Sequence, residues 1–452
     1  MPNGDEARWL APVSAFAAVA LGRALQIANG ELHPDAVFWL SVTLVLVFGA
    51  IVARRSGRLA AFDLKVLPTM AGAGVLLQVV QMYYTTPGVE LRDSPTLTAV
   101  IHLGPITFGA IGLALVVGPS PRMQRWLLGA FLAIHVAMGT TIIRHSPKSI
   151  IDVDVFHRQS IGALRSGVNP YAITFPNIYG DSQRYGADVS TPGRLLFGFP
   201  YPPTTLLLSL PGTLLARDHR YAALVAMQLA AVLMMLAQPR GFGVFASLIY
   251  LTSPRIFYVL QLSWTEPFVV LGLAAVVFAA CRDSRAVPWL FGAFLGLKQY
   301  LVFALPAAWL IVVSSRDRRG VLGWLARAAV IPTALTMPFV LWGPTAFVKS
   351  VVTLQFHQPF RPDSLSLLSW WASIGHPQLS SAIAFGVAAL AAALAVWRCP
   401  RTAAGFSAAV ALTFLAFFAF NKQAFCNYYF FVIGALCVTL AACATPTTSS
   451  RG

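Results

Sequence analysis

The sequence predicts an all-α, polytopic helical membrane protein. Only 11% of its 452 residues are charged and 57% are hydrophobic, whereas a soluble domain carries about 25% charged residues. So few charged side chains cannot coat a water-soluble globule, which excludes soluble enzymes, disordered chains and fibrous proteins. The apolar runs are roughly 17–22 residues long, close to the 20 or so that a helix needs to cross a bilayer. A β-barrel would instead show alternating segments of about ten residues.

The placement of the charge favours a membrane over a nucleic acid partner. The formal net charge is +16, but the basic residues lie in short links between apolar runs, as Arg54 and Arg55 do. Such links mark the cytoplasmic side of a membrane protein, so we expect no nucleic acid partner. The cysteines lack the spacing of a metal site and are expected to be buried thiols: Cys281, Cys399, Cys426, Cys437 and Cys443.

The first part of the chain contains five apolar runs, each expected to be a membrane-spanning helix. They lie near 10–28, 36–53, 66–82, 97–118 and 126–143. The links between them alternate between basic and acidic or balanced, which places the N-terminus in the cytoplasm and the end of the fifth run outside. The stretch 144–194 is long for a connecting loop. Because it is rich in aromatic, His, Asp and Arg residues, we expect an ordered extracytoplasmic loop.

The remainder contains further apolar segments near 203–216, 221–237, 241–252, 265–281, 288–313, 322–342, 378–397, 404–420 and 427–443. The run 288–313 lies between two basic links and is interrupted at Lys298, so we expect two half-length helices that meet there. The links 216–220 and 238–240 are both mildly basic, and charge does not settle which is cytoplasmic. The pattern predicts about 12–14 transmembrane helices in all.

These assignments predict how the chain is organised across the plasma membrane. Residues 1–123 form extra N-terminal transmembrane helices, and residues 124–444 form the main transmembrane region. The loops 144–194 and 343–377 lie outside. The tail 445–452 and the N-terminus are both cytoplasmic.

Two carboxylates stand directly after the fifth apolar run. Asp152 and Asp154 are spaced i, i+2, which does not place them on one helical face, so we do not expect them to act as an acid/base couple. We expect one to face a cavity and the other to cap a helix or pair with a basic residue. A plain helix cap is the alternative for either. Tyr171 follows in the same loop, in the sequence Gly-Val-Asn-Pro-Tyr.

Two further polar residues lie where apolar segments begin. Tyr201 belongs to Phe-Pro-Tyr-Pro-Pro, whose prolines fix a stiff entry into a helix. We expect its ring to line a substrate channel, with a rigid turn as the alternative. Glu266 begins a span, where a carboxylate also stabilises the helix N-terminus through the macrodipole.

Cations gather where the positive-inside bias predicts few of them. Lys298, Lys349 and Lys422 are three of the five lysines, and all lie at or near the predicted outer edge. His357 and Arg361 share an outer loop, for which a solvated loop is the alternative. Arginine binds phosphate through its bidentate fork, and a charge inside a membrane usually serves a pathway or pairs with an anion. An anionic ligand such as a lipid phosphate would account for this distribution.

A family resemblance rests on the order of four short motifs. They are Asp152 in an Asp-hydrophobic-x-Val-aromatic setting, Gly-Val-Asn-Pro-Tyr, Tyr-Pro-Pro, and Gly-Leu-Lys-Gln at 296–299. Over roughly 126–443 the chain resembles the C-fold (GT-C) glycosyltransferases. It is most similar to the bacterial polyprenol-phosphate-mannose-dependent α-mannosyltransferases of glycosyltransferase family 87. The four spans at 10–118 depart from the minimal pattern of that family.

The resemblance implies an inverting glycosyltransferase that acts on the extracytoplasmic face. Its donor would be a polyprenyl-phosphate sugar, with mannose expected, and its acceptor a glycolipid or glycan. Asp152 would be the general base, with Asp154 as the second choice. Four cations would stabilise the leaving phosphate: Lys298, His357, Arg361 and Lys422. Tyr171, Tyr201 and Glu266 would help to bind the substrates. We expect no cofactor and no metal, because Asp152-Val-Asp154 resembles a nucleotide-sugar motif but lies on the outer side.

Two other classes of function remain open. A lipid-linked-sugar flippase or transporter would often show repeated halves with matching broken helices, but the break near Lys298 has no partner in the other half. An O-antigen-type ligase or polymerase also uses a lipid-linked donor, and differs in taking a diphosphate instead of a monophosphate.

Overall fold

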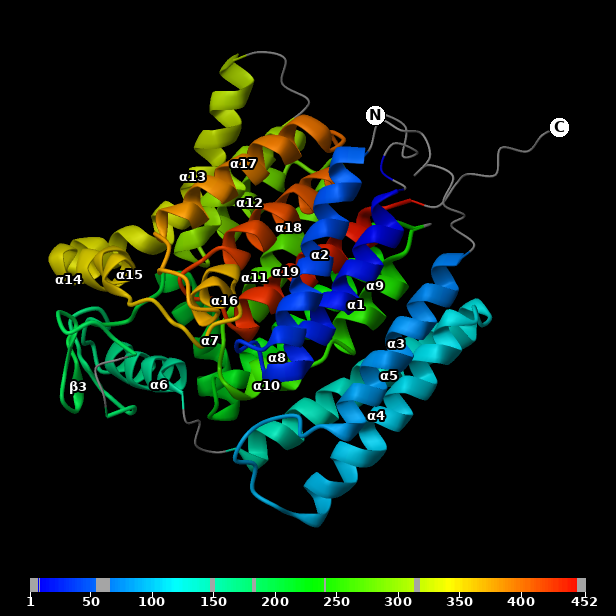
Figure 1. Ribbon diagram of the computed structural model, residues 1–452, viewed down its shortest axis with the longest axis horizontal. Helices are drawn as coiled ribbons and strands as arrows, with labels where there is room; N and C mark the ends of the chain where they lie inside the picture. The colour runs from blue at the N-terminus through cyan, green and yellow to red at the C-terminus, as the bar shows by residue number, and fades with distance from the viewer. Residues whose placement is uncertain are drawn as a thin grey trace.

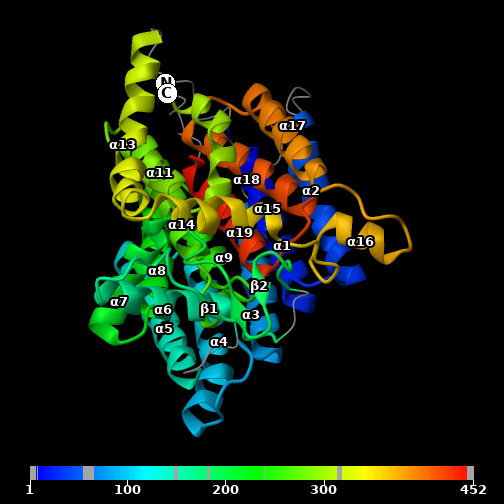
Figure 2. The same ribbon diagram turned by 90° about the vertical axis from the view of Figure 1, so that its left-hand side faces the viewer.

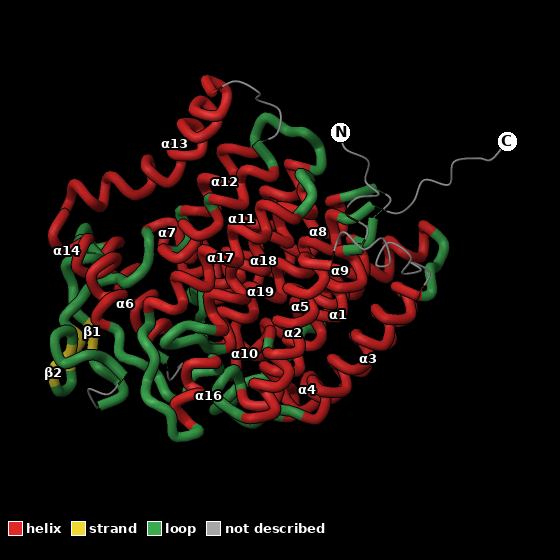
Figure 3. Tube along the Cα trace, turned by 45° about the horizontal axis from the view of Figure 1, so that its top comes forward, coloured by secondary structure: helices red, strands yellow, loops and turns green. Residues whose placement is uncertain are grey.

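The computed structural model describes residue 7 and residues 9–53, 66–146, 151–180, 184–239, 241–312 and 318–444. These described residues form an all-α structure, with 72% helix and 2% strand. Figure 3 shows that the strands are confined to one corner of the molecule. The basic link 54–65 and the tail 445–452, which carry part of the predicted orientation, lie outside the described residues.

The N-terminal helices are α1 (Leu10–Ala28), α2 (Pro34–Ala53), α3 (Leu67–Tyr84), α4 (Pro95–Val116) and α5 (Pro121–His145). Their ends follow local signals. Asn29 ends α1 in the left-handed conformation with φ 55°, and the hydroxyl of Ser94 caps α4 by accepting the N–H of Leu97. Helices α3, α4 and α5 lie together along one side of the molecule (Figure 1).

The predicted outer loop 144–194 is ordered over its described residues. It contains α6 (Asp152–Arg165) and a small antiparallel sheet of β1 (Phe175–Pro176), β3 (Arg194–Leu195) and β2 (Ser190–Thr191), in that spatial order. An apolar core separate from the main one holds this layer together, and includes Phe156, Phe175, Tyr185 and Phe197. The layer stands at the edge of the helical body (Figures 1 and 2).

The body continues with α7 (Pro203–Ala216), α8 (Arg220–Ala237), α9 (Gly243–Leu251), α10 (Ile256–Gln261), α11 (Glu266–Ala280) and α12 (Val287–Leu295). After it come α13 (Arg318–Trp342), α14 (Pro344–Val348), the π-helical turn η7 (Lys349–Thr353), α15 (Leu354–His357), α16 (Leu367–Ser373), α17 (Ala382–Arg398), α18 (Ala403–Ala419) and α19 (Cys426–Ala442). Helices α18 and α19 are apolar all round and almost wholly buried, as expected of helices at the centre of a bundle. The α1–α2 hairpin packs against this pair.

The run 288–313 is broken at the predicted place. Helix α12 ends at Leu295, and two 3₁₀ segments follow, η5 (Gln299–Ala304) and η6 (Pro306–Leu310). Lys298 stands in the break with extended backbone angles, φ −149° and ψ 147°. The second half is therefore a tighter 3₁₀ winding instead of the expected α-helix.

Six described helices are long and apolar enough to cross a membrane: Leu10–Ala28, Pro34–Ala53, Pro95–Val116, Pro121–His145, Arg220–Ala237 and Gly320–Trp342. Six shorter apolar helical segments accompany them: Pro203–Ala216, Glu266–Ala280, Gln299–Leu310, Ala382–Arg398, Ala403–Ala419 and Cys426–Ala442. Large apolar side chains such as Leu215 and Leu341 point outward. This is the composition expected of a membrane protein.

The links between helices gather at two ends of the bundle. At one end Arg220, just after the link 217–219, donates to the carbonyl of Ser146 at 2.8 Å. At the other end Gly241 forms a bridge with Ala444, and Arg282 donates to the carbonyl of Ala237 at 3.3 Å. The structure thereby separates the two links that charge left ambiguous. Residues 217–219 belong to the end that carries α6, whereas Gln238 and Gly241 belong to the other end.

Candidate functional site

A cavity of about 230 Å³ opens at the end of the bundle that carries α6. Segments far apart in the sequence form its walls. They are the α1–α2 link, α6, residues 179, 184 and 185, the entry to α7, the break after α12, α15 and the α18–α19 link. The predicted residues that line it are Asp152, Tyr201, Lys298 and Arg361.

Asp152 is the first residue of α6, and its partly exposed side chain lines the cavity. One carboxylate oxygen accepts the backbone N–H of Val153 at 2.7 Å, and the other accepts the hydroxyl of Tyr185. Removal from water raises the pKa of the Asp152 carboxyl above its usual value, although Tyr185, Val153, Arg184 and Arg361 oppose that shift. Asp152 therefore both supports the helix N-terminus and presents a carboxylate to the cavity.

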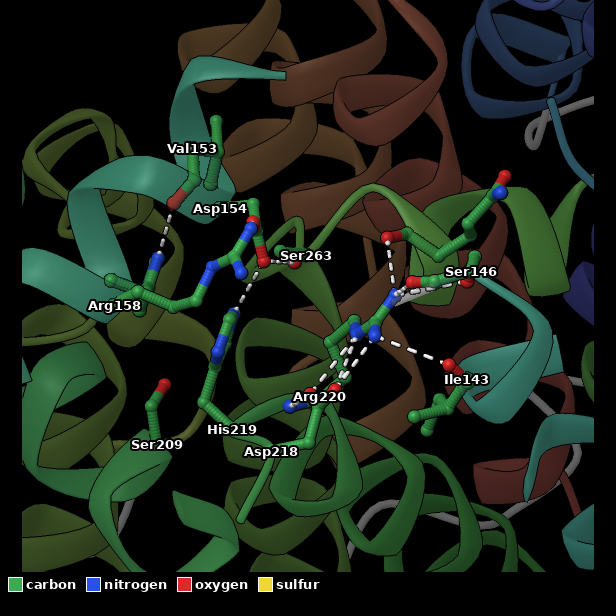
Figure 4. Close-up of polar contacts among 12 residues, drawn as sticks. Ile143, Ser146, Val153, Asp154, Arg158, Ser209, Asp218, His219, Arg220 and Ser263 are labelled. Carbon is green, nitrogen blue, oxygen red and sulfur yellow. Dashed lines mark hydrogen bonds and ion pairs between the residues drawn. The ribbon is translucent and has the colours of Figure 1, made fainter. Parts of the chain in front are cut away.

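Asp154 lies outside the cavity lining, in a buried polar cluster (Figure 4). Its side chain forms an ion pair with Arg158 and accepts the Ser263 hydroxyl at 3.1 Å. The Nε2 atom of His219 lies 3.7 Å from the same carboxylate. Of the two carboxylates, Asp152 is thus the one that a ligand in the cavity could contact.

Two guanidinium groups face the cavity. Arg361 is held by Asp363 through two hydrogen bonds of 2.9 and 2.6 Å, and its Cζ lies 4.8 Å from the ring centre of Phe425. Burial lowers the pKa of Arg361, but the ion pair with Asp363 outweighs this and leaves it raised. Arg184 stacks on Tyr179 with its Cζ 4.3 Å from the ring centre, and has no ion pair with any described residue.

Lys298 lines the cavity but already has an anionic partner. Its Nζ lies 3.3 Å from an Oε1 of Glu266, a carboxylate with no exposed surface. The same oxygen accepts the side-chain amide of Asn427 at 3.0 Å. Lys298, which was expected to bind the donor phosphate, is therefore one half of a buried ion pair. Glu266, which was expected to bind substrate, does not line the cavity. Lys298 also sits over the ring of Tyr201, 3.9 Å from its centre.

Three other predicted residues lie outside the cavity lining. The buried Tyr171 supports the wall, because its hydroxyl donates to the carbonyl of Tyr201 at 2.9 Å. His357 is exposed and lies 3.3 Å from Asp188. Lys422 fastens the loop before α19 by donating to the carbonyls of Gln355 and Gln358, at 3.2 and 2.6 Å. We expected Lys298, His357 and Arg361 to surround one phosphate. In the structure Lys298 is paired with Glu266 and His357 lies outside the cavity, so the three residues do not form one site.

Sequence reasoning missed several lining residues. Tyr179, Arg184 and Tyr185 lie in a loop whose local sequence has no distinctive motif, and the tertiary fold alone brings them to Asp152. Asn29 and Glu31 come from the α1–α2 link, which the charge pattern marked only as acidic. Gly30 is the one sequence signal that could have indicated a close approach of this link to another segment. The residue has φ +79°, and a Cβ there would lie 2.3 Å from the Cys426 nitrogen.

Comparison of the chain with protein-family models, with curated proteins and with solved structures finds no match. Within the described ranges, no group of three or more His, Cys, Asp or Glu residues could hold a metal ion. The site is thus defined by its own geometry: the carboxylates of Asp152 and Glu31, two guanidinium groups, a buried ion pair and a wall of tyrosines.

Proposed function

We propose that this protein is a membrane glycosyltransferase that moves a sugar, mannose by resemblance, from a polyprenyl-phosphate donor to a glycolipid or glycan acceptor. The observation that carries the proposal is the cavity at one end of an apolar helix bundle. There the Asp152 carboxylate, with a raised pKa, shares one space with Arg184 and Arg361. A base and an anion-binding pair are the two parts that such a transfer requires.

Asp152 acts as the general base in this mechanism. The acceptor hydroxyl attacks C1 of the donor sugar while its proton passes to the Asp152 carboxylate. The new glycosidic bond forms on the face opposite the leaving group, so the configuration at C1 inverts. A raised pKa suits this role, because a base is most effective when its pKa approaches the working pH. Asp152 would require the acceptor oxygen within about 2.6–3.2 Å.

Arg361 and Arg184 stabilise the leaving group. Cleavage of the bond between C1 and the phosphate oxygen leaves both bonding electrons, and an additional negative charge, on the polyprenyl phosphate. A fixed guanidinium can meet that charge with two parallel hydrogen bonds. Asp363 orients the Arg361 guanidinium, whereas Arg184 is exposed and could follow the phosphate.

Lys298 has an indirect role in this scheme. Paired with Glu266 and placed over the Tyr201 ring, it fixes that ring at the cavity wall. Tyrosine rings of this kind can stack on the apolar face of a sugar. Tyr171 holds the backbone of Tyr201 from behind.

The proposal also includes the orientation of the chain. About 12–14 spans would place the cavity, with the loops 144–194 and 343–377, on the extracytoplasmic side of the plasma membrane. Both termini would be cytoplasmic. In a background without native cysteines, an impermeant thiol reagent added from outside should label Ser373→Cys and not Arg285→Cys. The reverse pattern would overturn the orientation.

A transfer assay tests the activity. Purified protein is incubated with a panel of polyprenyl-phosphate sugars, and glycosylated product and released polyprenyl phosphate are measured together. We expect both in equal amounts, with Asp152→Asn reducing the rate on the order of 10²-fold. Asp188→Asn is the matched control, because this exposed carboxylate in the same loop does not line the cavity. Transbilayer movement of the donor without product would instead identify a flippase, and use of diphosphate donors alone would identify a ligase or polymerase.

A further inference from the structure

A second cavity, of about 720 Å³, lies between α1, α2 and α3. Its lining on α1 recurs at helical spacing, with Phe16, Val19, Arg23 and Ile27 on one face. Leu77 and Val80 of α3 are among the residues that form the opposite wall, and Trp39 of α2 is part of the remaining side. The volume falls in the range of known ligand pockets. The groove is apolar except for a small polar group.

Arg23 is the cation of that polar group. It is partly buried in α1, in a helix that is otherwise without charge from Leu10 to Ala28. No hydrogen bond or ion pair joins its guanidinium to any other described residue. A lone arginine within an apolar span is rare, because such charges normally pair or contact a ligand. Arg23 thus lacks the partner that its position calls for.

Gln81 of α3 is a second, independent sign of a missing ligand. Its side chain is 8% exposed and lines the cavity, yet neither its amide nitrogen nor its amide oxygen has a hydrogen-bond partner among the described residues. Buried polar atoms are seldom left unpaired in native proteins. The neighbouring Gln26 is satisfied, since it donates to the Thr85 hydroxyl at 2.6 Å.

The one carboxylate on the lining does not neutralise Arg23. Asp35 stands in the first turn of α2, its side chain is 76% exposed, and it lies beside the imidazole of His33 at 3.9 Å. It forms no ion pair with Arg23 among the described contacts. Water and salt screen an exposed carboxylate much more than a half-buried guanidinium, so an anion near Arg23 is still favoured.

We propose that this groove is a binding site for a lipid that carries a phosphate. The acyl or prenyl chain would lie against the apolar faces of α1 and α3, and the phosphate would receive the guanidinium of Arg23 and the side-chain amide N–H of Gln81. Arginine suits this ligand through its bidentate geometry. The site is separate from the catalytic cavity, and its ligand is a bound lipid and takes part in no reaction. The proposal of this lipid site depends on the membrane location of the protein and not on the proposed glycosyltransferase activity.

Native mass spectrometry can test the site on the full-length protein. Dioleoyl-phosphatidylglycerol is titrated into protein released from phosphatidylcholine nanodiscs, and the dissociation constant of the first bound anionic lipid is measured. Arg23→Gln should weaken this binding at least fivefold. Arg327→Gln removes the same charge from an exposed position on α13 and should change it less than twofold. Equal effects of the two variants, or no effect of Arg23→Gln, would overturn the proposal.

Two further arms make the test robust. Gln81→Glu keeps the size of the side chain and places a carboxylate beside Arg23, so it should also weaken phosphatidylglycerol binding. This variant tests the site even when Arg23→Gln does not fold. Unchanged binding by Gln81→Glu would count against the site. Competition with a C55 polyprenyl phosphate, measured in an Arg361→Gln background to silence the main cavity, distinguishes the source. Displacement assigns the site to prenyl lipids, and its absence assigns it to diacyl lipids.

Discussion

Asp152 and Asp154 are two residues apart on one helix, yet they occupy opposite kinds of environment. Asp152 faces the open cavity and its carboxylate contacts a tyrosine hydroxyl and a backbone N–H. Asp154 is buried against Arg158, Ser263 and a histidine. Burial raises the pKa of both carboxyls. The direction of a pKa shift therefore does not identify a general base by itself; access to a ligand and the identity of the partners do.

The largest effect should come from removing each carboxylate in turn. Asp152→Asn should lower the transfer rate on the order of 10²-fold, because the amide cannot accept the acceptor's proton. Asp154→Asn should retain most of the rate per folded molecule but lower the melting temperature, since it leaves Arg158 without its ion-pair partner. Initial rates and thermal unfolding of both variants measure this. Loss of activity only in Asp154→Asn would exchange the two roles.

The same contrast separates Lys298 from Arg361. Lys298→Met leaves Glu266 buried without its cation, a change that typically destabilises by about 3–5 kcal/mol. The double variant Lys298→Met/Glu266→Gln should recover much of that loss. Thermal unfolding of the single and double variants tests the pairing. A single variant that is as stable as wild type but has lost donor binding would return Lys298 to the role of phosphate ligand.

Arg361 should affect donor use with little effect on folding. Arg361→Lys keeps the charge and loses the planar fork, and we expect about a tenfold rise in the KM for the donor. The KM for the acceptor should remain within twofold. Steady-state kinetics with each substrate varied in turn separates the two. An effect confined to the acceptor would place the phosphate elsewhere in the cavity.

The smallest effect concerns pH. As a base, Asp152 must be deprotonated, so kcat/KM should fall as the pH drops through a pKa that lies above the usual value of an aspartate, which is about 3.9. The Tyr185 hydroxyl donates to the ionised carboxylate and lowers that pKa. Tyr185→Phe should therefore move the acidic limb to higher pH, with only a few-fold change in the plateau rate. A limb that stays in place would mean that another group sets it.

The sequence predicted the helical class and the break at Lys298, because apolar run length and charge spacing are local properties. The preference for Asp152 over Asp154 came from the family resemblance. The structure places Asp152 on the cavity lining and Asp154 outside it, and the role of Asp152 as the base stays a prediction.

The sequence did not predict the partners of the cations. Glu266 and Lys298 stand on different elements, and only packing reveals that they neutralise each other. The sequence also did not identify Arg184 as a cavity residue, because its place beside the cavity depends on its contact with Tyr179 in the folded chain.

The close contact between Gly30 and Cys426 has a consequence for how the protein is made. The α1–α2 link is synthesised before the start of α19, against which it packs, and 396 residues (426 − 30) separate Gly30 from Cys426. Asn29 and Glu31 can take their places in the cavity wall only when α19 has entered the bundle. Since a ribosome adds roughly 5–20 residues per second, the first hairpin must wait for tens of seconds without its partner. The nascent chain cannot hold a finished cavity until α19 is in place.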